Sequence, residues 1–266
     1  MGYPTLDAAL AFPNNVPPAK THIVVTDTLQ ASANFLIHHF VGNQLKAGGN
    51  VILVGLSQIF NHYFLISRKL GINLSTFKQS GQFVFIDGLT HLNEYAHASP
   101  YPLANTPTTP TDTLDVSSVK EKSTDLLKHF YDSVKKHIVG KARPILIVDD
   151  ANVLLSCGFG LHRVSHLITR LKVLMEQNDG TLVTIVHADE SSAEDEEQDA
   201  FVRNVLHSAH LVLQIQALNS GLARDVHGEL SIIHGPQCFK SNVQPQSLHY
   251  RILDNNAEFF AKGYNK

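Results

Sequence analysis

Residues 21–36, THIVVTDTLQASANFL, contain a short apolar strand, a polar turn and the beginning of a helix. In a nucleotide-binding α/β domain, this junction carries a glycine-rich loop whose backbone N–H groups and lysine hold the phosphates. The turn TDTLQASA has neither glycine nor lysine, and the carboxylate of Asp27 would repel a phosphate. We therefore expect a nucleotide-binding fold with a degenerate phosphate loop and no bound cofactor.

Apolar runs of strand length alternate with helical segments along the first two thirds of the chain. Continuous apolar strands separated by helices are typical of a mostly parallel sheet built from right-handed βαβ units. The predicted strands cover residues 21–25, 50–56, 82–89, 144–150 and 181–189, and the predicted helices cover residues 33–49, 57–71, 119–137 and 161–177.

From about residue 209 the pattern changes to that of antiparallel hairpins. HLVLQIQAL (210–218) and GELSIIHG (228–235) flank one turn-rich segment, and SLHYRIL (247–253) and EFFAKG (258–263) flank a second. A parallel βα core followed by antiparallel strands is the order found in RecA-like domains. We predict a three-layer α/β fold of this P-loop-NTPase type, with a mostly parallel central sheet and antiparallel strands at its C-terminal side.

Length and composition indicate one domain covering residues 1–266, with an extended leader over 1–20 and a Pro/Thr-rich surface loop over 98–118. A net charge of −3 provides no general positive field for nucleic acid. The two cysteines form no CxxC pair, which suits a reducing compartment rather than a disulfide framework. We find neither a signal-peptide pattern nor an apolar run long enough for a membrane helix, and we expect an intracellular protein without a membrane partner.

The strand PILIVDD (144–150) has the form of a Walker B strand, in which apolar residues precede acidic ones. It would place Asp149 and Asp150 at the carboxyl edge of a parallel sheet, where a carboxylate can hold magnesium or orient a water. On this pattern alone we favour the alternative, in which the two acids accept hydrogen bonds from the first N–H groups of the following helix.

Two charged segments each allow a ligand site and a plainer interpretation. The acidic run DESSAEDEEQD (189–199) could bind a metal or a basic partner, but we favour a solvated loop that supplies acids to a helix N-terminus. KKHIVGKAR (135–143) contains Lys135, Lys136, Lys141 and Arg143 without an acid among them. These cations could contact an RNA backbone, but cations are also common at helix C-termini, the interpretation that we favour.

The segment SGLARDVHGEL (220–230) contains Arg224, which could reach a neighbouring subunit as a positively charged finger. Alternatively, Arg224 pairs with Asp225 or Glu229 on a hairpin surface. The following segment SIIHGP has His234 at a position where strands that carry such a finger often have a basic residue. We therefore expect no positively charged finger at that position.

Six segments, taken together in order and spacing, resemble the family of the sixth subunit of the Elongator complex. The resemblance extends over about residues 20–264 and is weakest across the Pro/Thr-rich loop. The segments are NFLIHHF, VILVGLSQIFNHYFLISRKLG, PILIVDDANVLLSCGFG, HADESSAEDEEQDAF, SGLARDVHGEL and FFAKG.

This resemblance implies a RecA-like subunit without Walker A that is not itself an enzyme. It implies a heterohexameric ring with the fourth and fifth Elongator subunits, each present twice, which associates with the catalytic Elongator subcomplex. The ring would bind tRNA and modulate its release during modification of the wobble uridine (U34), in the cytoplasm and also the nucleus. Asp149, Asp150, Arg224 and Asp225 are then candidates for contacts with partner subunits, and the four cations of residues 135–143 are candidates for RNA.

Two rival hypotheses remain open at this stage. An active NTPase with an unorthodox phosphate loop would use Asp149 and Asp150, and a stand-alone RNA-binding module would use the cations between Lys135 and Arg143.

Overall fold

The computed structural model describes residues 3–89, 112–113, 124–189, 196–218, 221, 223, 225–238 and 242–262. Its helices are α1 (Pro4–Leu10), α2 (Asn34–Lys46), α3 (Phe60–Lys69), α4 (Leu74–Gln79), α6 (Thr124–Ile138), α7 (Asn152–Ser156), α8 (Leu161–Gln177) and α9 (Glu196–His207), with a short 3₁₀ helix, η1 (Pro13–Asn15). Its strands are β1 (Thr21–Asp27), β2 (Val51–Gly55), β3 (Phe83–Asp87), β4 (Asp112–Thr113), β5 (Ile145–Asp149), β6 (Thr181–His187), β7 (Leu211–Gln216), β8 (Gly228–His234), β9 (Gln246–Leu253) and β10 (Asn256–Ala261).

The described strands form one sheet in the order β10-β9-β8-β7-β1-β6-β5-β2-β3-β4. The ladders from β7 through β1 to β4 are parallel, and those that join β7, β8, β9 and β10 are antiparallel. The predicted α/β fold and both predicted hairpins, β7–β8 and β9–β10, are confirmed.

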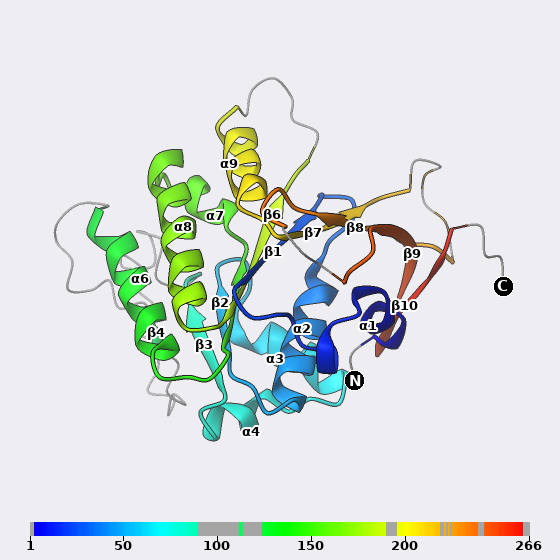
Figure 1. Cartoon of the computed structure of the whole chain (residues 1–266), viewed down its shortest axis with the longest axis horizontal. Coiled ribbons are helices and arrows are strands. Elements are labelled where there is room, and N and C mark those ends of the chain that lie inside the picture. Colours follow the sequence, from blue (N-terminus) through cyan, green and yellow to red (C-terminus); the bar gives the residue numbers. More distant parts are fainter. Residues whose placement is uncertain are drawn as a thin grey trace, which may run out of the picture.

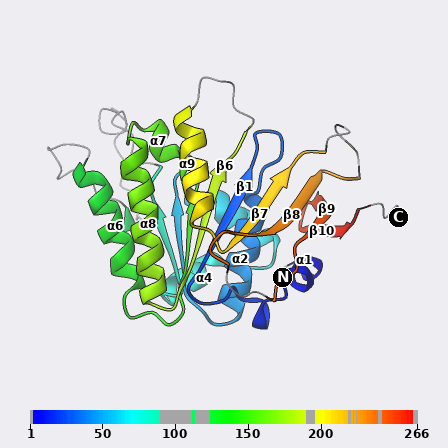
Figure 2. The same cartoon turned by 45° about the horizontal axis from the view of Figure 1, so that its top comes forward.

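Helices cover the two faces of the sheet and make three layers (Figures 1 and 2). Helices α1–α4 pack on one face, and α6–α9 pack on the other. Successive side chains of a strand point to opposite faces, so β1 places Ile23 and Val25 in the first core and Val24 in the second. Burial on both faces explains why the central strands read as continuous apolar runs.

The prediction of an extended leader is wrong, because residues 4–10 form helix α1. Leu6 and Leu10 lie four residues apart, share one face of the helix and are both buried in the first core. Tyr3 is also buried, and its hydroxyl donates to the carbonyl of Phe35 in α2 at 3.1 Å. The leader therefore adds a covering helix to the domain.

The Pro/Thr-rich loop predicted for residues 98–118 lies largely outside the described residues. Its described part, Asp112–Thr113, forms β4, which pairs in parallel with Ile86 and Asp87 of β3.

Candidate functional site

The loop between β1 and α2 stands where a phosphate loop would lie. Thr28 and Ala31 exchange backbone hydrogen bonds, and Leu29 at the tip of the turn is 92% exposed. The carboxylate of buried Asp27 turns back and accepts a hydrogen bond from the backbone N–H of Ala33 at 2.8 Å, immediately before α2. A helix N-terminus favours an anion, and in this chain the anion is its own side chain.

A second carboxylate contacts the same loop from β6. The backbone N–H of Leu29 donates to Oδ1 of Asp189, just after the end of that strand, at 2.7 Å. Two N–H groups of the loop are thus satisfied by acids of the protein. The residues present do not fit a nucleoside triphosphate, because the loop has no lysine and Asp27 already occupies the anion position.

His187 joins the carboxyl ends of three neighbouring strands. It is the last residue of β6, which lies between β1 and β5. Its Nδ1 contacts Oδ1 of Asp27 at the end of β1, and its Nε2 lies 2.8 Å from Oδ2 of Asp150, which follows β5. We call Asp27, His187 and Asp150 the strand-end triad.

The geometry of the strand-end triad requires a protonated imidazole. Both ring nitrogens face carboxylate oxygens, and both can donate only when the ring is the imidazolium cation. The hydrogen bond to Asp150, followed by that to Asp27, raises the pKa of His187 to about 10 from 6.5. A positive charge therefore stands between two buried carboxylates at neutral pH and removes much of the cost of burying them.

The side chain of Asp149, which directly precedes Asp150 of the triad, contacts α3. Its Oδ2 accepts a hydrogen bond from the hydroxyl of Tyr63 at 2.5 Å, and both residues are buried. Burial raises the pKa of Asp149 to about 6, although the hydrogen bond from Tyr63 opposes that shift. The Tyr63 hydroxyl therefore supports a carboxylate that is ionised at neutral pH.

Asp150 also has a local structural role. Its Oδ1 accepts from the backbone N–H of Asn152 at 2.7 Å, near the start of α7. The Asn152 side chain in turn accepts from the backbone N–H of His187 at 3.0 Å and donates to Oε1 of Gln198 at 2.7 Å. Asp150 thus both accepts from the helix that follows β5 and binds His187.

Sequence reasoning located Asp149 and Asp150 but missed His187, Tyr63 and Asn152. The available signal was the position of His187 at the end of the apolar run TLVTIVH, parallel to the position of Asp149 at the end of PILIVD. Among the described residues, no group of three His, Cys, Asp or Glu side chains has an arrangement that could hold a metal ion. His187 directs its two nitrogens at different carboxylates, so the triad is a bridge between strands and not a ligand set.

The acidic run contributes to helix N-termini where it is described. Glu196, Glu197 and Asp199 lie in the first turn of α9, and Oε1 of Glu197 also accepts from the backbone N–H of Leu161 at the start of α8, at 2.8 Å. These contacts agree with the helix-terminus interpretation, and residues 190–195 lie outside the described part.

The four cations of residues 135–143 lie at the opposite end of β5 from Asp149. Lys135 and Lys136 are exposed in the last turn of α6, and Lys141 donates from Nζ to the carbonyl of Gly81 at 3.1 Å. Arg143, also exposed, has a carbonyl that accepts from Nε2 of Gln44 at 2.8 Å. The five residues of β5 span roughly 16 Å, so this basic segment and the triad are separate surfaces.

Arg224 lies outside the described residues, whereas Asp225 is described and exposed. Asp225 accepts from Arg251 of β9 at 3.3 Å, and Glu229 pairs with Lys262 at 2.8 Å. His234 contacts the carbonyl of Val243 through Nε2 at 2.7 Å. The structure brings Asp225 to the β9–β10 hairpin, away from the strand-end triad.

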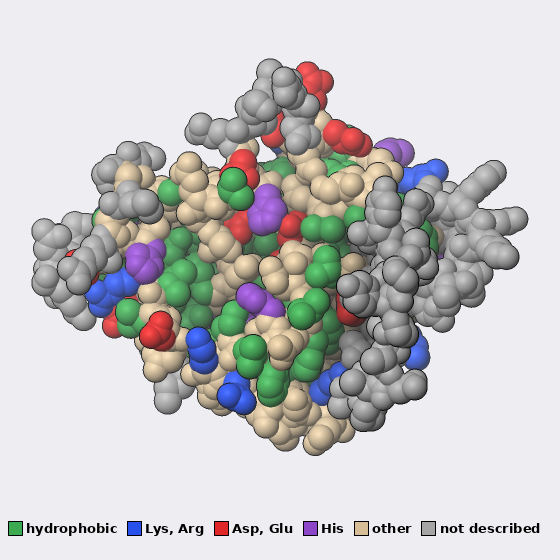
Figure 3. Space-filling model, turned by 180° about the vertical axis from the view of Figure 1, so that it is seen from behind, with side chains coloured by type: hydrophobic (Ala, Val, Ile, Leu, Met, Phe, Trp, Pro, Cys, Tyr) green, Lys and Arg blue, Asp and Glu red, His purple; other side chains and the backbone are tan. Residues whose placement is uncertain are grey.

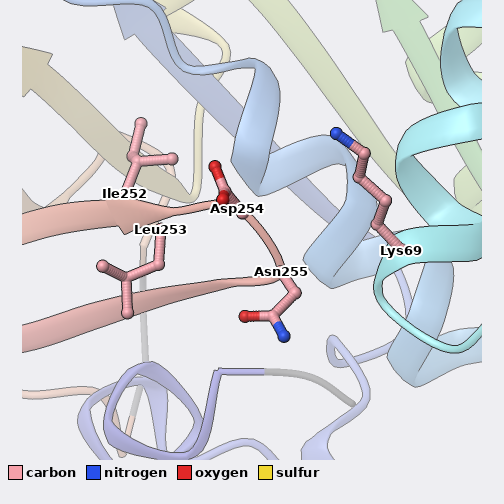
Figure 4. Close-up of a pocket in the computed structure, with 5 residues that line it drawn as sticks. All are labelled: Lys69, Ile252, Leu253, Asp254 and Asn255. Carbon is pink, nitrogen blue, oxygen red and sulfur yellow. The ribbon is translucent and has the colours of Figure 1, made fainter.

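Two cavities of the described chain have no residue of the triad in their lining. One of about 790 Å³ lies between Lys69 of α3 and the β9–β10 hairpin, with Asp254 and Asn255 of the turn in its lining (Figure 4). The described part also has no helix long and apolar enough to span a membrane.

Comparisons with known proteins give one consistent result. Residues 3–254 match the family model described as Elongation complex protein 6. The chain is 35% identical over 248 residues to human Elongator complex protein 6, with 88% of each chain covered. It is 32% identical over 269 residues to the Xenopus laevis protein of the same name, with coverage of 98% of this chain and 97% of that protein.

Solved structures share the fold at low sequence identity. A KaiC-like protein from Pyrococcus horikoshii superposes with a TM-score of 0.56 at 12% identity, covering 91% of each chain. An uncharacterised protein from the same organism, solved with an unknown peptide, superposes with a TM-score of 0.66 at 12% identity and 98% coverage of each. These likenesses support the RecA-like architecture and nothing finer.

Proposed function

Since this chain belongs to the Elongation complex protein 6 family, we propose that it serves in Elongator as a non-catalytic subunit of a ring. In this proposal its neighbours are the fourth and fifth Elongator subunits, and two copies of each form a heterohexamer. The ring associates with the catalytic subcomplex in the cytoplasm and also the nucleus. There it binds tRNA and modulates its release during wobble-uridine modification.

The observation that carries the non-catalytic part is the filled phosphate-loop position. Asp27 caps the start of α2, and its carboxylate also contacts the imidazolium of His187, so neither the N–H group before α2 nor this cation is free to bind a phosphate. A RecA-like subunit with this arrangement retains the shape of the carboxyl edge of its sheet. That edge is then available for contacts with other subunits rather than for nucleotide binding.

Exposed apolar side chains support a role in an assembly. Ile59 and Leu65 at α3 are 50% and 45% exposed, and hydrophobic side chains gather on the back face of the molecule (Figure 3). Exposed apolar patches on a protein surface mark sites where other proteins bind.

Native mass spectrometry tests the ring. The full chain is co-expressed with both related subunits, with each one singly, and alone. We expect a stable particle with two copies of each subunit only when all three are present. A monomer or homo-oligomer that is unchanged by the other two would contradict the proposal.

A second candidate function is an NTPase with an unorthodox phosphate loop, because Asp149 and Asp150 lie at the carboxyl end of a parallel strand. Titration of the purified chain with a non-hydrolysable ATP analogue and magnesium distinguishes the two. We expect no binding, whereas saturable binding that Asp150→Asn abolishes would favour the enzyme.

RNA contact is tested on the basic segment. Replacement of Lys135, Lys136, Lys141 and Arg143 by Ala in the assembled ring should weaken tRNA binding and reduce the dependence of affinity on salt, because fewer counterions are released. Lys20→Ala, a cation paired with Asp179 at 3.1 Å, is the matched control. If the dependence of tRNA affinity on salt concentration is unchanged, this segment does not contact the RNA.

A further inference from the structure

The outermost strand, β10, has an unused edge. It pairs with β9 on one side, and no strand of the described chain pairs with it on the other (Figures 1 and 2). Its sequence, NAEFFA, contains no proline and no lysine, the residues that natural proteins often use to block a free edge. An edge strand without these blocking residues is a template for another strand.

The hairpin register determines which backbone groups point outward. Asp254 and Asn255 form a two-residue turn, and Leu253 pairs with Asn256 directly beside it. In a hairpin with this turn the flanking pair is hydrogen-bonded, and hydrogen-bonded and non-hydrogen-bonded pairs then alternate. The N–H and C=O groups of Ala257, Phe259 and Ala261 therefore point away from β9.

A groove of about 590 Å³ runs along this edge. It is lined by Asn256, Ala257, Glu258, Phe259 and Phe260 of β10, by Pro4 and Thr5 of α1, and by Asp225, Val226 and Arg251. Five consecutive residues of one edge strand line it, so its length follows the strand. This shape fits an extended polypeptide.

The two sides of the groove differ in chemistry. Phe259 is buried toward the core and its ring lies 5.7 Å from that of Tyr3, so this side is apolar. On the other side Arg251 is shared between Glu258, at 2.9 Å, and Asp225, at 3.3 Å, which leaves one negative charge in excess among these three residues. A strand with alternating apolar and basic side chains complements both sides.

We propose that the outer edge of β10 docks one extended segment of a partner polypeptide, whose alternating apolar and basic side chains fill the groove between α1 and Arg251. The segment extends the sheet by one strand, with backbone hydrogen bonds supplying affinity and the two sides of the groove supplying specificity.

The test uses the full chain and a short synthetic peptide that alternates valine and lysine. Binding is followed by fluorescence anisotropy, and hydrogen exchange reports the amides of Ala257 and Phe259. We expect saturable binding and slower exchange at these two amides. Because the probe is synthetic, the result does not depend on membership of a ring.

Two pairs of variants make the test specific. Ala257→Pro removes an outward N–H while leaving the ladder to β9, and should weaken binding by about tenfold or more, whereas Ala257→Ser keeps the N–H and should bind normally. Glu258→Lys reverses the net charge on the polar side of the groove, so this variant should prefer a valine–glutamate peptide to the valine–lysine peptide. Glu258→Gln should bind both peptides weakly. Circular dichroism verifies that each variant is folded.

Four results would overturn the proposal, three of them from the peptide experiments and one from the free chain. The peptide results are no binding of the valine–lysine peptide, binding that a folded Ala257→Pro variant retains in full, and binding without protection of the β10 amides. A homodimer of the free chain that itself protects these amides would assign the edge to a second copy and would likewise contradict it.

Discussion

Replacing His187 by glutamine should remove a pH-dependent part of the stability of this protein. The substitution keeps hydrogen-bonding capacity but deletes the positive charge between Asp27 and Asp150. The pKa of His187 is raised from 6.5 to about 10 by those two partners, so the folded state holds the proton more tightly than the unfolded state does. This contribution is fully present below pH 6.5 and is lost as the pH rises toward 10.

The size of the effect follows from the shift and from exposure. Each pKa unit corresponds to about 1.4 kcal/mol, which would give about 5 kcal/mol for a fully buried group. The side chain of His187 is 45% exposed, and solvent screening reduces the expected contribution to about 2 kcal/mol. The free energy of unfolding of the wild type should therefore fall by about 2 kcal/mol more than that of the variant between pH 6.5 and 9.5.

Urea unfolding followed by far-ultraviolet circular dichroism at several pH values measures this difference, and the absence of tryptophan from the chain makes that signal preferable to fluorescence. His162→Gln, on the exposed side of α8, is the matched control and should follow the wild type. If the free energies of unfolding of the wild type and His187→Gln change in parallel between pH 6.5 and 9.5, the reasoning about the strand-end triad is refuted.

Three further outcomes can be measured with the same unfolding assay. Tyr63→Phe should cost about 1–3 kcal/mol at pH 8 and less at pH 5, because it removes one of the hydrogen-bond donors to the buried Asp149 carboxylate. An equal cost at both pH values would contradict the role of ionised Asp149. Leu6→Ala in α1 should cost about 2–5 kcal/mol, while Leu29→Ala at the exposed loop tip should cost less than about 0.5 kcal/mol, and similar values would mean that α1 is not part of the core. Burial lowers the pKa of His22 to about 3, so its neutral form contributes stability that is present above pH 6.5 and lost as the pH falls. In His22→Gln the free energy of unfolding should therefore fall less steeply with decreasing pH, by about 1.4 kcal/mol per pH unit between pH 6.5 and 4. An unchanged slope would exclude His22 as the source of this loss.

Most of the architecture was predictable because it depends on local patterns. The runs VILV in β2 and ILIV in β5 are apolar at every position, a composition typical of strands covered on both faces. The helix over residues 161–177 was predicted with its exact limits, since its apolar residues recur at helical spacing. The leader was mispredicted because prolines obscure the short repeat of Leu6 and Leu10, whose burial depends on a core formed by distant strands.

The sequence by itself determined the fold class, the family and the lack of phosphate-loop residues, because apolar periodicity and missing residue types can be read along a single chain. Only the tertiary structure decided what occupies that position instead. Asp27, Asp150 and His187 are separated by 37 or more residues, and they meet because parallel strands bring their carboxyl ends to one edge of the sheet. The same holds for the free edge of β10, since strand order across a sheet is set by long-range pairing and leaves no local signal in the residues of the edge strand itself.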